Sequence, residues 1–164
     1  MKTNPTDEDV RFIRECIELS RKALANKDKP FGAIVTLNGE VLARAVNNSK
    51  NKVYEHAELV ALNEASKKLG KIDLMGCTLY SNCEPCPGCS FFIREYHISR
   101  LVYSISSLGM GGISRYPVLK DEGLNKFKPY FGDVPEIIPN ILEKEALEVF
   151  EGTELENYFG SDKK

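Results

Sequence analysis

The sequence predicts a three-layer α/β/α sandwich around a mixed sheet of about five strands. Its support is an amphipathic opening segment, a strand–turn–strand pattern after it, and a later alternation of strand-like and helix-like segments. The chain has 164 residues, of which 42% are hydrophobic, so it is long enough to bury a core without cross-links. We therefore expect a single domain over residues 1–164.

Local patterns predict the first three elements. Residues 6–25 should form a helix, because a threonine N-cap precedes acidic residues and apolar side chains recur at helical spacing (Val10, Ile13, Ile17 and Leu24). Residues 31–37 and 40–46 have the composition of strands, and Asn38-Gly39 between them is a favoured hairpin turn. The chain is therefore expected to begin as a helix followed by a β-hairpin.

Helices and strands alternate along the remainder of the chain. Gly70 is typical of a helix C-terminus, and Pro85 is tolerated in the first turn of a helix. Helices are expected at residues 56–69, 85–96 and 117–121 and once or twice within 141–159, and strands at residues 77–81, 100–104 and 135–138. A hairpin followed by strand–helix alternation is the basis of the predicted fold class.

Composition limits the classes of function. The formal net charge is −2 and the pI is about 5.8, so no overall positive charge favours nucleic acid as a partner. Residues 1–10 are polar and acidic rather than a signal peptide, and no apolar run is long enough to span a membrane. Three of the five cysteines fall within residues 83–89, a spacing typical of metal binding in a reducing compartment. We therefore expect a cytoplasmic metalloprotein without a membrane partner.

Two short motifs indicate a metal site. The H-A-E motif that begins at His56 and the P-C-P-G-C motif that ends at Cys89 offer three zinc ligands: His56, Cys86 and Cys89. Three protein ligands leave the fourth tetrahedral position for water, which is the pattern of a catalytic zinc. A helix of about 14 residues runs roughly 21 Å away from His56, and the following strand returns a comparable distance. Both motifs should therefore lie at helix N-termini, which favour thiolates, and hold one zinc ion per chain.

Cys83 and His97 leave other readings of the metal site open. An iron–sulfur cluster would want a fourth cysteine at the position that Ile93 occupies. A closed structural zinc site would want Cys83 or His97 as its fourth ligand, but His97 lies about 12 Å further along the predicted helix. We favour three ligands with Cys83 outside the site, and a four-ligand site that includes Cys83 stays the main alternative.

Glu58 is a carboxylate that the metal does not need as a ligand. Alone it would be interpreted as a solvated charge at a helix start. Zinc lowers the pKa of a bound water toward about 7, so a glutamate beside that water can take its proton. Glu58 could then pass the proton to a ring nitrogen of a substrate and later to a departing amine. The predicted reaction is hydrolytic deamination, in which hydroxide adds to an amidine carbon and ammonia leaves.

These residues match the H-x-E and P-C-x-x-C signature of zinc nucleobase deaminases. The chain resembles the cytidine/deoxycytidylate deaminase superfamily, from residues 30–33 (P-F-G-A) to Cys89, and the expected fold is cytidine deaminase-like. The C-E-P-C-P-x-C form is similar to the branch that contains guanine, cytosine and transfer-RNA adenosine deaminases. The resemblance implies that His56, Cys86 and Cys89 bind zinc and that Glu58 shuttles protons.

The same resemblance implies further contacts. It places Asn47, Phe31 and Ala57 against the substrate, with Asn48 as the alternative to Asn47 and a core position as the alternative for Phe31. It also implies a homodimer. Tyr158 and Phe159 are interpreted as packing residues, and the alternative is that they cap a pocket, in this chain or in a partner subunit.

The resemblance leaves the substrate open. Residues 109–116 offer Arg115 and no acidic residue of the kind that guanine deaminases use to read the purine amine. The C-terminal region is acidic, whereas transfer-RNA deaminases typically carry a basic surface. We therefore expect a free purine or pyrimidine base or nucleoside as the substrate. A transfer-RNA adenosine deaminase is the alternative, and a structural zinc module without catalysis is the third hypothesis.

Overall fold

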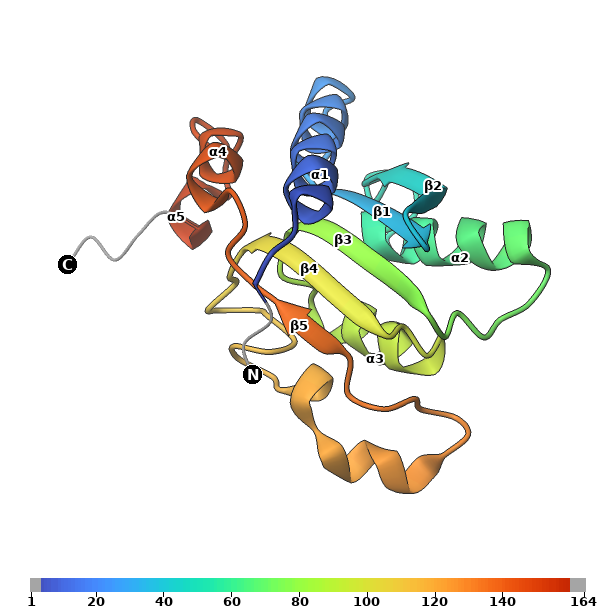
Figure 1. The fold of residues 1–164 in the computed structure, drawn as a ribbon. Coiled ribbons are helices and arrows are strands. Elements are labelled where there is room, and N and C mark those ends of the chain that lie inside the picture. The colour runs from blue at the N-terminus through green and yellow to red at the C-terminus, as the bar shows by residue number, and fades with distance from the viewer. Residues whose placement is uncertain (1–3, 160–164) are drawn as a thin grey trace.

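The computed structural model describes residues 4–159 (Figure 1). Residues 1–3 and 160–164, which the expected single domain includes, lie outside the described residues. In chain order the elements are α1 (Asp7–Ala25), β1 (Gly32–Leu37), β2 (Glu40–Val46), α2 (Ala57–Leu69), β3 (Cys77–Cys83), α3 (Pro87–Glu95), β4 (Arg100–Ile105), the 3₁₀ helices η1 (Val118–Lys120) and η2 (Glu122–Phe127), β5 (Glu136–Ile138), α4 (Glu143–Glu148) and α5 (Glu156–Phe159).

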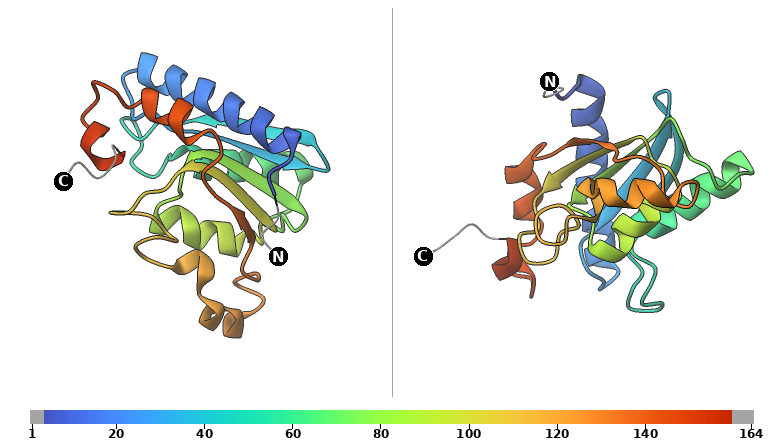
Figure 2. Two further views of the ribbon diagram at one scale, coloured as in Figure 1. Left: turned by 60° about the vertical axis from the view of Figure 1, so that its left-hand side comes forward. Right: turned by 90° about the horizontal axis from the view of Figure 1, so that it is seen from below.

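The five strands form one mixed sheet in the order β2-β1-β3-β4-β5. β1 pairs antiparallel with β2 and β3, whereas β4 pairs parallel with β3 and β5. Helices α1 and α4 pack on one face of the sheet and helices α2 and α3 on the other, as the views of Figure 2 show. The predicted three-layer fold class is therefore confirmed.

The sheet alternates its side chains between two hydrophobic cores. Ile34, Tyr80 and Val102 face α1 and α4, whereas Val35 and Leu79 face α2 and α3. These positions are buried on both sides because the strands run between helical layers rather than along a solvent face. None of the helices over residues 4–159 is both long enough and apolar enough to cross a membrane.

The predicted boundaries hold with small shifts. α2 begins at Ala57 and α3 at Pro87, each two residues or fewer after the expected start, because His56 and Cys86 take extended N-cap conformations. β3 continues to Cys83, and the C-terminal segment divides into α4 and α5. The 3₁₀ helix η2 was not expected, because no helical periodicity marks it.

Close packing of α1 on β1 explains the glycine in the P-F-G-A segment. A Cβ atom at Gly32 would lie 2.6 Å from the backbone oxygen of Cys16 and 2.6 Å from the Cβ of Leu19. Contacts this short require the helix to move away from the strand. Gly32 therefore sets the distance between α1 and the sheet, directly beside Phe31.

We expect Gly32→Ala to lower the free energy of unfolding by about 1–3 kcal/mol, because the added methyl group meets helix backbone that cannot rotate aside. Urea-induced unfolding measures the change. Gly109→Ala is the matched control, since a Cβ there has no atom within 4 Å and the substitution should cause no loss. Equal stability of the two variants would contradict the packing argument.

Candidate active site

The two sequence motifs meet at a cavity of about 380 Å³. Its walls come from the α1–β1 and β2–α2 loops, the N-terminal ends of α2 and α3, the segments that follow β3 and β4, and the C-terminal segment. The lining residues are Lys29, Phe31, Asn47, Ser49, His56, Glu58, Cys83, Glu84, Cys86, Ser107, Met110, Leu155, Tyr158 and Phe159. The cavity therefore lies at the edge of the sheet where loops leave the central strands, and ionisable side chains line it.

His56, Cys86 and Cys89 converge on one point. Nδ1 of His56 lies 3.6 Å from Sγ of Cys86 and 3.5 Å from Sγ of Cys89, and all three potential ligand atoms lie within 4.8 Å of one another. A tetrahedral zinc with ordinary bond lengths would hold a sulfur and a nitrogen ligand about 3.6 Å apart. The three side chains therefore fit one zinc ion without rearrangement.

The surroundings shift the pKa values of the two thiols in opposite directions. A hydrogen bond with Cys89 lowers the pKa of Cys86 to about 4 against the opposing effect of burial, and His56 lowers it further. The same hydrogen bond and burial raise the pKa of Cys89. The two thiols are therefore shifted in opposite directions, and a bound zinc would hold both as thiolates.

Cys83 and His97 lie outside this ligand group. Among residues 4–159, the group of His56, Cys86 and Cys89 is the one set of three or more potential ligands close enough to hold a metal. Cys83 is buried at the cavity wall, where burial raises the pKa of its thiol. His97 contacts the backbone oxygen of Pro129 at 2.8 Å instead. The structure thus brings together the three-ligand set without a fourth cysteine.

Glu58 lies beside the ligands and away from bulk solvent. Its side chain is buried, and Ser81 Oγ donates a hydrogen bond to Oε1 at 3.2 Å. Oε2 lies 3.8 Å from Sγ of Cys89. Burial raises the pKa of the Glu58 carboxyl group, which makes it a better proton acceptor. Ser81 was not predicted, because nothing in the sequence marks that strand position as facing the carboxylate.

The two asparagines that the sequence offers as substrate contacts have different surroundings in the structure. Asn47 is buried, lines the cavity and donates from Nδ2 to Asp28 Oδ1 at 2.8 Å. Asn48 instead donates a hydrogen bond to the Glu55 carboxylate and accepts one from Asn51, and it is not among the residues that line the cavity. These contacts place Asn47, rather than Asn48, in the cavity wall.

Phe31 and Ala57 have different environments. Phe31 is half-buried, lines the cavity and packs on Phe150 with ring centroids 5.9 Å apart. Ala57 is fully buried in the core beneath α2 and is not among the residues that line the cavity. Its backbone could still face a substrate, so its substrate contact stays a prediction.

The C-terminal segment completes the cavity. Phe159 packs on Phe150 with ring centroids 4.7 Å apart, whereas Tyr158 is 66% exposed and lines the same cavity. Packing therefore accounts for Phe159. Both residues also line the cavity, so the alternative of a position at the pocket of this chain applies to Tyr158 and Phe159 alike.

Glu84 organises the loop after β4, a role that the sequence did not reveal. Its buried carboxylate accepts hydrogen bonds from the backbone N–H groups of Ser107, Ile113 and Ser114 at 2.7–2.8 Å, and from Ser114 Oγ at 2.7 Å. A Cβ at Gly111 would lie 2.0 Å from Glu84 Oε1, so only a glycine lets the loop wrap the carboxylate this closely. The loop carries Met110 into the cavity wall. The cysteine motif draws attention to Glu84, but it does not reveal the hydrogen-bond donors, which lie more than 20 residues away in the sequence.

We expect Glu84→Gln to loosen this wall, because an amide NH₂ cannot accept the N–H donors that it would face. An unpaired buried donor costs about 1–3 kcal/mol. The KM for the substrate should rise more than kcat falls, amide exchange at residues 107–114 should accelerate, and zinc content should not change. Glu122→Gln, at an exposed position, is the control. Unchanged exchange in the loop would contradict the assignment.

Comparisons with known proteins agree with this geometry. Residues 6–105 match the model of the cytidine and deoxycytidylate deaminase zinc-binding region. The tRNA-specific adenosine deaminase of Streptococcus pyogenes serotype M1 is 34% identical over 122 residues, which cover 73% of this chain and 71% of that protein.

Two solved structures have the same fold. A structure from work on tRNA deaminases that edit adenosine to inosine at the wobble position has a TM-score of 0.72 and 28% identity, covering 85% of this chain and 98% of that one. Guanine deaminase from Bacillus subtilis has a TM-score of 0.60 and 26% identity, covering 76% of this chain and 92% of that one. The family model and the fit of the three ligands confirm zinc as the cofactor. The chain belongs to the zinc-binding cytidine and deoxycytidylate deaminase family.

Proposed function

We propose that this protein is a zinc-dependent hydrolase that converts adenosine in transfer RNA to inosine and releases ammonia. The observation that carries the reaction is the placement of Glu58 beside the three-ligand group at one cavity. Its similarity to tRNA-specific adenosine deaminases over most of its length supports the substrate.

The expectation of a free base or nucleoside as the substrate is wrong. It is overturned by the relatives at 30–34% identity that are tRNA-specific adenosine deaminases. The expectation rested on the acidic C-terminal region and the net charge of −2. Such totals average over the whole surface, whereas a large polyanion responds to the charges around the site where it binds.

In the proposed reaction His56, Cys86 and Cys89 hold the zinc ion. When bound, zinc supplies Lewis acidity that makes water acidic enough to attack near neutral pH. Glu58 takes the proton of the attacking water and delivers it to N1 of the adenine ring as the new C6–O bond forms. Glu58 then takes the remaining proton from the new C6 hydroxyl group and delivers it to the exocyclic amine, so that the C6–N bond breaks, the C6=O bond forms, and ammonia and inosine are the products.

Asn47 is proposed as a substrate contact with a defined polarity. Its Nδ2 donates to Asp28 Oδ1 at 2.8 Å and to Ser49 Oγ at 2.7 Å. Both amide protons are therefore used, which leaves Oδ1 to accept from an N–H or O–H group of the nucleotide. Phe31 and Ala57 are kept as further contacts. A homodimer and a cytoplasmic location stay predictions for sedimentation and cell fractionation.

A direct test uses a transfer RNA transcript with adenosine at the wobble position. We expect the zinc-loaded protein to form inosine, measured by nuclease digestion and chromatography of the nucleosides. The same preparation is assayed for ammonia release from free adenosine, adenine, guanine and cytosine. Rapid release from one of these free compounds, with no inosine in the transcript, would overturn the proposed substrate and leave the deaminase chemistry standing.

A further inference from the structure

A second cavity, of about 440 Å³, adjoins the catalytic cavity. The two share Lys29, Ser49 and Leu155 in their walls, so they lie side by side. Lys27 and Lys50 also line the second cavity. All three lysines are exposed, and we call this group (Lys27, Lys29 and Lys50) the lysine rim.

A buried carboxylate holds the rim together. Asp28 accepts hydrogen bonds from the backbone N–H of Lys29 at 2.7 Å and of Lys50 at 3.0 Å, and from the side chains of Asn47 and Ser49 at 2.8 and 3.2 Å. These hydrogen bonds lower the pKa of Asp28 even though burial opposes its ionisation. Asp28 therefore joins the α1–β1 loop to the β2–α2 loop, and places two ammonium groups from distant parts of the chain at one opening.

The charges of the rim are not neutralised by neighbouring side chains. Over residues 4–159, no carboxylate lies within ion-pair distance (4.0 Å) of the Nζ atoms of Lys27, Lys29 or Lys50. The acidic groups that face the second cavity are the buried Asp28 and the exposed Glu154. Lys50 Nζ donates a hydrogen bond to the backbone oxygen of Asn26, which leaves its charge unneutralised, so the rim presents three positive charges to an external anion.

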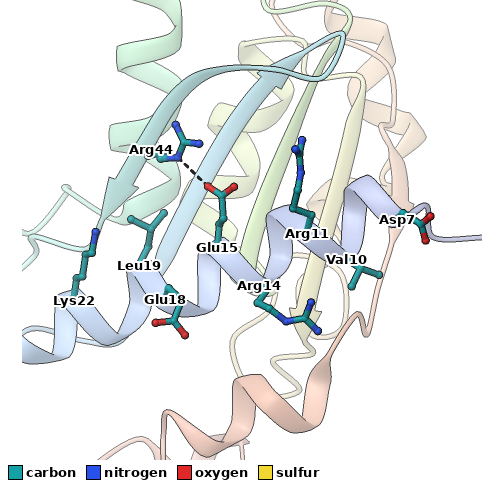
Figure 3. A pocket seen from close by; sticks show the side chains of 9 residues that line it. All are labelled: Asp7, Val10, Arg11, Arg14, Glu15, Glu18, Leu19, Lys22 and Arg44. Atoms are coloured by element: carbon teal, nitrogen blue, oxygen red, sulfur yellow. Dashed lines mark hydrogen bonds and ion pairs between the residues drawn. The ribbon is translucent and has the colours of Figure 1, made fainter.

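A larger cavity beside α1 provides the contrast (Figure 3). It holds about 590 Å³ and is lined by four cationic side chains interleaved with three acidic ones. There Arg44 pairs with Glu15 at 2.9 Å and Arg14 with Glu145 at 3.2 Å. Ion pairs thus neutralise two of the four cations, Arg14 and Arg44, and this cavity shares no lining residue with the catalytic one.

We propose that the lysine rim binds backbone phosphates of the RNA strand next to the nucleotide that enters the catalytic cavity. This inference rests on the proposed function and specifies how the substrate is held. A base inserted toward Glu58 leaves its own and its neighbours' phosphates at the cavity mouth, where Lys29 stands. Ammonium groups bind phosphates independently of base sequence, so the rim sets affinity and orientation, and the catalytic cavity selects the base.

The test compares wild-type protein with two double variants that each lose two positive charges. Lys29→Ala/Lys50→Ala removes part of the rim. Lys67→Ala/Lys68→Ala is the matched control, because those exposed lysines lie about 17 Å along α2 from His56. The probe is the transfer RNA transcript. Its dissociation constant is measured by fluorescence anisotropy at several salt concentrations, and the KM and kcat for inosine formation at one.

We expect the rim variant to reduce the slope of log affinity against log salt by about 1.4, or 0.7 for each lost contact to a single strand. This corresponds to a roughly tenfold weaker affinity at 0.15 M salt, with a matching rise in KM and an almost unchanged kcat. The control variant should retain the wild-type slope. Equal slopes for the rim variant and wild-type protein, with inosine still formed, would overturn the rim but not the proposed function. No inosine from wild-type protein would overturn the proposed function and the rim with it.

Discussion

Glu58→Gln should reduce kcat for deamination by between about 10²- and 10⁴-fold, which is the usual contribution of a positioned general acid/base. Glutamine preserves the size of the side chain and can still accept the hydrogen bond of Ser81, but it cannot take a proton from water. Because the carboxylate both accepts and returns a proton in the proposed reaction, the substitution interrupts both transfers. The effect should appear in kcat, with the dissociation constant for the transcript changed little.

Zinc content and a second glutamate on the same helix control this experiment. The Glu58→Gln protein should retain about one zinc per chain, since its three ligands are untouched. Glu64→Gln alters an exposed carboxylate that pairs with Lys67, and should leave the activity unchanged. Full activity of Glu58→Gln with zinc bound would show that another group moves the protons.

Cys89→Ala should weaken zinc binding by more than about 100-fold. Loss of a residue that only supports a ligand already weakens metal binding by up to about 100-fold, and Cys89 is itself a proposed ligand. The variant keeps only His56 and Cys86, and its activity should fall with its metal content. Zinc content after dialysis is measured by elemental analysis. In wild-type protein, zinc at 100 times its dissociation constant should stabilise the fold by about 2.7 kcal/mol, and this thermal shift should be lost in the variant.

Cys83→Ala separates the three-ligand site from the closed four-ligand site. Cys83 lies at the end of β3 within the same C-x-x-C-x-x-C run, but outside the group of convergent ligand atoms. The variant should bind zinc as wild-type protein does and should retain its activity. A loss of zinc as large as that of Cys89→Ala would identify Cys83 as a ligand and remove the open position that catalysis requires.

The sequence was sufficient for the features that depend on local patterns. The turn at Asn38-Gly39, the C-cap at Gly70 and the ligand spacing of Cys86 and Cys89 are each set by neighbouring residues, and the structure has them where they were expected. The meeting of His56 with the cysteines also followed, because helix and strand lengths fix where the chain returns.

Other features depend on contacts between distant segments. Glu84 reads in the sequence as one more charge in a motif, and only the folded loop after β4 shows four donors around it. Asp28 likewise has a role that the sequence does not show, because it accepts a hydrogen bond from the backbone of Lys50, 22 residues away. The substrate was misjudged for a related reason. That expectation relied on overall charge, which composition gives directly, whereas the exposed lysines of the rim come together only where Asp28 joins two loops.

The catalytic cavity has two kinds of wall with separate tasks. His56, Glu58 and Cys86 stand on helix starts that are braced against the central strands, whereas Lys29 and Met110 stand on connections and Tyr158 stands on α5. Under the proposed function, reaction chemistry and substrate choice depend on different parts of the scaffold. Exchanging the connections for those of another deaminase should retarget the protein while its metal occupancy is preserved.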